Sequence, residues 1–111
     1  MKKLLLLAII GLGAWQHFQK SPVENNPIAA EYAALHEEPV ILYATDWCGY
    51  CRKTRQFLTA NQIAYQEYNI EQSTEGRQQY DTLGGQGVPL LLVEGEVIRG
   101  YNPAAISQAL R

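Results

Sequence analysis

Apolar residues in this chain gather in short runs that are separated by polar and turn-forming residues. Residues 40–44 form an unbroken apolar run with β-branched and aromatic members, which predicts a buried central strand. Residues 89–93 form a second run of this kind, and the Glu-Gly pair at 94–95 predicts a hairpin turn into a strand over 96–98. A weaker strand of mixed pattern, rich in tyrosine, is predicted over 64–70.

Three helices are predicted in the same part of the chain. One spans residues 48–60, the second begins at Ser73 or Thr74 and ends at the glycine pair 84–85, and the third is capped by Asn102. The element order is therefore βαβ, then α, then ββα. A crossover unit gives parallel strands and a hairpin adds antiparallel ones. This order predicts an α/β domain with a four-stranded mixed sheet and three helices.

The N-terminal residues 1–20 predict a signal peptide or a membrane anchor. Lys2 and Lys3 precede an apolar run, residues 4–15, that carries no charge. The run is short for a membrane-spanning helix, which needs about 20 apolar residues, so a cleaved signal and a membrane tether through residues 4–18 both stay open. Under the positive-inside rule the two lysines stay in the cytoplasm and the rest is exported. We therefore expect a bacterial cell-envelope protein on the periplasmic side, anchored to the inner membrane or secreted to the periplasm.

Residues 21–38 read as an acidic linker or tether, and residues 39–111 as the folded domain. The linker has four glutamates and neither lysine nor arginine, and residues 28–38 could form a short helix. The domain is long enough for a single core, and we expect it to be monomeric. The whole chain has a net charge of −2, and its basic cluster at 52–55 is short, so we expect no nucleic-acid partner.

Both cysteines of the chain lie in the segment 47–51, Trp-Cys-Gly-Tyr-Cys, where the first strand meets the first helix. A helix N-terminus points backbone N–H groups at the first sulfur and favours its thiolate. Cys48 is therefore the predicted nucleophile, and Cys51, one turn later, is the predicted resolving thiol. A permanent structural disulfide would close too small a loop to stabilise much. No metal site is predicted, because a second CxxC is absent and both histidines lie outside the predicted domain.

Arg52 and Lys53 follow the two cysteines directly and are predicted to stabilise the thiolate, with Arg55 close behind. Cations in the first turns of a helix oppose its dipole, at a cost of about 0.3 kcal/mol or more each. A neighbouring thiolate is a reason to tolerate that cost. The alternative is that these side chains point into solvent.

Beyond the cysteines, the chain resembles the glutaredoxins across nearly the whole predicted domain. The resemblance rests on the segment around the cysteines, on residues 87–89 (Gly-Val-Pro), and on Gly100 after the hairpin. It implies a thioredoxin-like fold of glutaredoxin type. It also implies that Pro89 is cis and faces the dithiol, and that the backbone of Val88 pairs with the bound thiol substrate. An ordinary trans proline that opens a strand is the alternative.

The loop over residues 99–103 departs from the pattern of the glutathione-using glutaredoxins. Those proteins typically have Gly-Gly-x-Asp where this chain has Arg-Gly-Tyr-Asn-Pro, which looks more like the redoxins that supply electrons to ribonucleotide reductase. Gly100, Tyr101 and Asn102 are therefore candidate substrate-binding residues, whereas glutathione as a co-substrate is in doubt and the electron donor is unidentified. Asp46, where many glutaredoxins have a lysine, would repel the glutathione carboxylate or have no role.

Trp47 and Tyr50 border the first thiol and either shape a substrate groove or pack against the core. The sequence thus predicts a thiol–disulfide oxidoreductase, without a bound cofactor, that reduces or isomerises protein disulfides or glutathione mixed disulfides. Two alternatives stay open. The middle pair Gly-Tyr also occurs in glutaredoxins that carry an iron–sulfur cluster with glutathione, and the CxxC could be vestigial in a non-catalytic tethered binding module.

Overall fold

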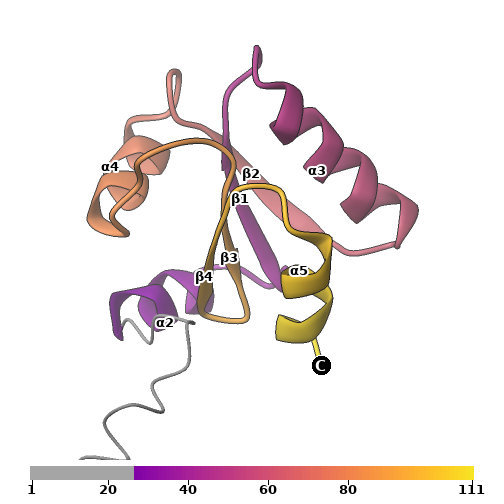
Figure 1. Ribbon diagram of the computed structural model, residues 1–111. Coiled ribbons are helices and arrows are strands. Elements are labelled where there is room, and N and C mark those ends of the chain that lie inside the picture. The colour runs from indigo at the N-terminus through magenta and orange to yellow at the C-terminus, as the bar shows by residue number, and fades with distance from the viewer. Residues whose placement is uncertain (1–26) are drawn as a thin grey trace, which may run out of the picture.

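The computed structural model describes residues 27–111, in which helices cover both faces of a four-stranded sheet (Figure 1). In chain order the elements are α2 (Pro27–Ala34), β1 (Val40–Ala44), α3 (Gly49–Ala60), β2 (Tyr65–Asn69), α4 (Thr74–Thr82), β3 (Leu90–Val93), β4 (Glu96–Arg99) and α5 (Pro103–Ala109). The predicted signal or anchor and the first part of the linker lie outside the described residues. Within residues 27–111, no helix is both long and apolar enough to cross a bilayer.

The sheet is mixed, with the strand order β2-β1-β3-β4. The strand β1 pairs in parallel with β2 and antiparallel with β3, and β3 pairs antiparallel with β4. The predicted four-stranded mixed sheet is therefore confirmed. The turn between β3 and β4 is made by Glu94 and Gly95, whose positive φ values of 49° and 82° suit a two-residue hairpin.

The central strand β1 faces two separate cores because successive side chains point to opposite faces of the sheet. On one face, Val40, Leu42 and Ala44 pack with residues of α3 and α5. On the other face, Ile41 and Tyr43 pack with residues of α2 and α4. All five are at most 1% exposed, which explains why this strand is a continuous apolar run rather than an alternating one.

The predicted number of three helices is wrong, since the described part of the chain contains four. The additional helix is α2, which lies within the predicted linker 21–38, where a short helix over residues 28–38 was left open. Its Ala29 is fully buried, and Tyr32 and Ala33 pack against the same core as Ile41 and Tyr43. The helix therefore covers a sheet face that α4 alone leaves open. Its apolar stripe of small residues was too weak a signal to predict this packing.

Side chains that were expected to cap the later helices do so. Ser73 accepts a hydrogen bond from the backbone N–H of Gly76 at the start of α4, and Asn102 accepts one from Ala105 at the start of α5. Each cap satisfies a backbone donor that the first turn of a helix leaves unpaired. These caps fix where both helices begin, and the second sets the loop that follows β4.

Candidate active site

Cys48 lies immediately before α3 and acts as its N-cap. Its backbone is extended (φ −84°, ψ 117°), and its Sγ accepts the backbone N–H of Cys51 at 3.1 Å. The side chain is 7% exposed, so the sulfur lies at the surface boundary of the core. An N–H group aimed at the sulfur and the positive end of the helix dipole both favour a thiolate here.

Cys51 is the inner member of the pair and is fully buried on the core-facing side of α3. Both cysteines are free thiols. Burial first, and then the hydrogen bond with the Cys48 side chain, raise the pKa of Cys51 to about 12, although the backbone of Thr45 and the positive charge of Arg55 act in the opposite direction. Cys51 is therefore a neutral thiol at neutral pH.

This difference predicts selective alkylation of the reduced protein. With iodoacetamide at pH 8, Cys48 should take up the label, and the labelling rate of Cys51 should be lower by a factor of at least about a hundred. The reason is that only the thiolate is nucleophilic and Cys51 is both protonated and buried. In a Cys48→Ser variant, labelling of Cys51 should still be rising with pH above 9. Mass spectrometry of time points gives both rates, with the urea-unfolded protein as the control that takes two labels. Equal labelling of both cysteines in the native protein would contradict the prediction.

The segment before β3 lies beside Cys48 because β3 runs antiparallel to β1. Leu90, at the start of β3, pairs with Tyr43, near the end of β1. The Val88–Pro89 peptide bond is cis, as expected, and the Sγ–H of Cys48 donates to the carbonyl oxygen of Val88 over 3.6 Å. A cleft of about 260 Å³ adjoins this point; its lining residues are Gln86, Gly87, Val88, Pro89, Leu90, Arg99 and Gly100.

Three aromatic side chains are exposed rather than packed in a core, two of them beside the cysteines and one in the loop after β4. Trp47 is 70% exposed, Tyr50 61% and Tyr101 36%. The alternative that Trp47 and Tyr50 pack against the core is therefore wrong. The indole Nε1–H of Trp47 donates to Glu71 Oε1 at 3.0 Å, which holds the ring without covering it. Trp47 and Tyr50 offer apolar contact area to a molecule that approaches the thiol.

The cations of α3 lie in two different places. Arg52 and Lys53 line a shallow depression of about 500 Å³ on the outer side of the helix, where the Lys53 ammonium lies 5.4 Å from the centre of the Tyr50 ring. In the described part of the chain, neither side chain makes a hydrogen bond or ion pair with Cys48. Arg55 points the other way and is paired with Glu67 of β2. Stabilisation of the thiolate by Arg52 and Lys53 stays a prediction.

Two side chains, one at the end of β4 and one in the loop that follows it, are engaged in holding the fold. The amide oxygen of Asn102 caps α5. The guanidinium of Arg99 donates to the carbonyl oxygens of Gly84, at 2.7 Å, and Leu83, at 3.4 Å, at the end of α4. Gly100 joins the site through its backbone, since its N–H donates to the carbonyl oxygen of Pro89 at 2.9 Å.

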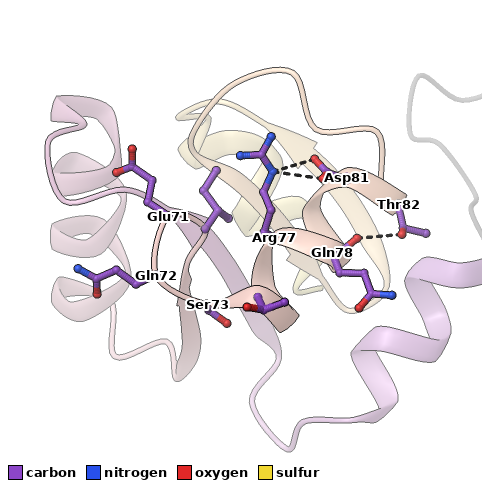
Figure 2. A pocket seen from close by; sticks show the side chains of 9 residues that line it. Glu71, Gln72, Ser73, Arg77, Gln78, Asp81 and Thr82 are labelled. Atoms are coloured by element: carbon purple, nitrogen blue, oxygen red, sulfur yellow. Dashed lines mark hydrogen bonds and ion pairs between the residues drawn. The ribbon is translucent and has the colours of Figure 1, made fainter.

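A groove of about 590 Å³ beside the start of α4 was not foreseen from the sequence. Figure 2 shows its lining, in which Arg77 is bound by Asp81 and the Ser73 cap lies at one end. Glu71 connects this groove to the dithiol loop through Trp47. No residue pattern indicated Glu71, because its partner lies 24 positions away along the chain.

The described residues hold no cluster that suggests a resident metal ion. Between residues 27 and 111 there is no group of three or more His, Cys, Asp or Glu side chains that could coordinate one. The two cysteines are surrounded by a helix terminus, a backbone carbonyl and exposed aromatic rings.

Comparison with known proteins agrees with this geometry. The glutaredoxin family model matches residues 40–98. An uncharacterized glutaredoxin-like 8.6 kDa protein in the rubredoxin operon of Clostridium pasteurianum is 30% identical over 70 residues, which are 62% of this chain and 93% of that protein.

Solved structures share the fold. A mutant of the thioredoxin-like protein BC3987 is 25% identical with a TM-score of 0.61, covering 65% of this chain and 94% of its own. The NrdH-redoxin from Escherichia coli is 17% identical with a TM-score of 0.59, covering 65% of this chain and 93% of its own. The predicted thioredoxin-like fold is thereby confirmed. The chain belongs to the glutaredoxin family and is a glutaredoxin-like redox protein with a CxxC motif at Cys48 and Cys51.

Proposed function

We propose that this protein is a thiol–disulfide oxidoreductase that reduces or isomerises protein disulfides or mixed disulfides. The observation that carries the proposal is the setting of Cys48. Its sulfur caps α3, accepts the Cys51 N–H at 3.1 Å, and lies 3.6 Å from the carbonyl oxygen of Val88. A substrate sulfur that lies along the backbone at Val88 would meet the Cys48 thiolate directly.

The reaction has two exchange steps. The Cys48 thiolate attacks a sulfur of the substrate disulfide, so that one S–S bond breaks, a mixed disulfide with Cys48 forms, and a substrate thiolate leaves and takes up a proton. Cys51 then loses its proton to solvent and attacks Cys48, which releases the second substrate thiolate. The two electrons of the protein dithiol pass to the substrate, and the protein is left with a Cys48–Cys51 disulfide.

Protein substrates are favoured over glutathione because two polar side chains around the site are already hydrogen-bonded to the protein backbone. Arg99 and Asn102, which could otherwise hold the carboxylates or amides of a tripeptide, serve as caps of α4 and α5. The exposed rings of Trp47, Tyr50 and Tyr101 provide apolar area that suits a polypeptide. We further propose, from the basic and apolar leader, that the domain works on the periplasmic side of the bacterial envelope.

A Cys51→Ala variant expressed in the host tests this proposal. Without the resolving thiol, the mixed disulfide on Cys48 should accumulate, and non-reducing electrophoresis with mass spectrometry should identify what is attached. A Cys48→Ser, Cys51→Ala double variant is the control and should trap nothing. Recovery of the single variant with Cys48 free would contradict the mechanism, whereas glutathione as the main adduct would contradict the preference for protein substrates.

A further inference from the structure

Arg55 is held rigidly at the centre of three segments of the site. It lies one helical turn after Cys51 on α3, and its Nε and Nη2 donate to the two carboxylate oxygens of Glu67 on β2, each at 2.8 Å. Nη2 also donates to the carbonyl oxygen of Thr45 at 3.2 Å. A forked pair of this kind fixes the direction as well as the position of a guanidinium.

This arrangement connects Arg55 to the resolving thiol. Thr45 is 2% exposed, so its carbonyl oxygen has little access to water and depends on a protein donor. The backbone of the same residue acts to lower the pKa of the Cys51 thiol. Arg55 thus supports the segment just before the dithiol and lies one turn after Cys51 on the same helix, and its positive charge acts to lower the pKa of that thiol.

The charged surroundings of Cys51 are few. The groups that act on its titration are the Cys48 thiol and the Arg55 guanidinium, and those that act on Arg55 are Glu67, Tyr65 of β2 and Cys51 itself. The side chains of Arg55 and Glu67 are each 26% exposed, so their charges are only partly screened by water. Arg55 is the one cation among these groups. The Cys48 sulfur lies instead at the N-terminus of α3, where it accepts the backbone N–H of Cys51 at 3.1 Å.

We propose that Arg55, held by Glu67 and Thr45, is a positioning residue for the second exchange step, in which it stabilises the Cys51 thiolate as that thiolate forms. This inference rests on the proposed function. In this step Cys51 releases its proton to solvent, its thiolate attacks the Cys48 sulfur, the Cys48–Cys51 bond forms, and the bond from Cys48 to the substrate sulfur breaks. The substrate leaves as a thiolate and is protonated. Arg55 therefore sets how long a substrate stays attached to Cys48.

The two steps can be separated with 5,5′-dithiobis(2-nitrobenzoate) at one equivalent in a stopped-flow instrument. Attack by Cys48 releases the first thionitrobenzoate in a second-order phase, and attack by Cys51 releases the second in a first-order phase. In an Arg55→Gln variant, we expect the second phase to slow by roughly threefold or more at pH 7, with its pH profile displaced upward, because less of Cys51 is then present as thiolate and the higher nucleophilicity of that thiolate offsets only part of the loss. The first phase, also measured in the Cys51→Ser background, should change by less than about twofold.

Three further variants separate the charge of Arg55 from its contribution to folding. Arg55→Lys should restore most of the second-phase rate. Glu67→Gln keeps an amide oxygen as acceptor but removes the opposing charge, so its second phase should be as fast as that of the wild type or faster. Arg77→Gln removes the guanidinium of another arginine–carboxylate pair, which is exposed on α4, and should alter neither phase.

The outcomes also separate this inference from the proposed function. Absence of the first phase in the wild type would overturn the proposed function. A normal first phase together with an unchanged second phase in Arg55→Gln would overturn the role of Arg55 and leave the proposed function intact. Equal slowing in Arg55→Gln and Glu67→Gln, with no displacement of the pH profile, would show that the pair only stabilises the fold. Thermal unfolding of each variant is recorded alongside the rates.

Discussion

Replacement of Cys48 by serine should reduce disulfide-reductase activity to the uncatalysed background, the largest functional effect of any single substitution in this chain. A serine hydroxyl does not ionise near neutral pH and cannot form the mixed disulfide on which both steps depend. Cys51 cannot substitute for it, since burial and its raised pKa keep that thiol protonated. Reduction of insulin disulfides with dithiothreitol as the electron source, followed by turbidity, measures the loss.

The matched control is Cys51→Ser, which leaves the attacking thiol in place. It should lose turnover but should still release one equivalent of thionitrobenzoate at close to the wild-type rate. If Cys48→Ser kept more than about a tenth of the activity, the assignment of Cys48 as the nucleophile would fall, since even a hundredfold loss is small for a missing nucleophile. If Cys48→Ser and Cys51→Ser lost insulin turnover and the first release of thionitrobenzoate to the same extent, the assignment of one cysteine as nucleophile and the other as resolving thiol would be contradicted.

Leu42→Ala should produce a large loss of stability, about 2–5 kcal/mol in the free energy of unfolding. Leu42 is fully buried at the middle of β1, where it pairs with Glu67 on one side and Leu91 on the other. Its side chain fills the core between the sheet and the helices α3 and α5, and strands on both sides restrict collapse into the cavity. Urea unfolding followed by circular dichroism measures the change.

The chain offers a matched control for this truncation. Leu35 follows α2 and is 63% exposed, so Leu35→Ala removes the same atoms from a position in water and should change stability by less than about 0.5 kcal/mol. Equal losses in the two variants, or a loss below about 1 kcal/mol for Leu42→Ala, would contradict the account of β1 as the strand that supports both cores.

Much of the fold could be predicted because local chemistry and tertiary packing agree in this chain. Every residue of strands β1 and β3 is buried, and both strands therefore appear as continuous apolar runs in the sequence. Ser73 and Asn102 cap helices in the structure as their side chains predicted. The two cysteines were found by spacing alone, since a CxxC at the start of a helix needs no distant partner to be recognised.

The features that were missed all depend on distant partners. Helix α2 is stable on the sheet because Ala29 meets a surface that other elements create. Glu67 belongs to a strand whose five residues are all half-buried, a pattern that does not show which side chain faces α3. Sequence proximity drew attention to Arg52 and Lys53, but direction around a helix decides which cation faces the core. That direction places Arg55, rather than its neighbours, against β2.

The cap of α3 is made by the Cys48 sulfur, the same atom that is oxidised and reduced in the reaction. A thiolate sulfur is a strong acceptor for the Cys51 N–H, whereas the same sulfur in a disulfide is a weak one. Each oxidation therefore weakens the hydrogen bond that caps the first turn of α3, and each reduction restores it. The amide proton of Cys51 should exchange with solvent more slowly in the reduced protein than in the oxidised protein. Through this single N–H group, the oxidation state of the dithiol changes the local stability of the start of α3, which is higher in the reduced protein than in the oxidised protein.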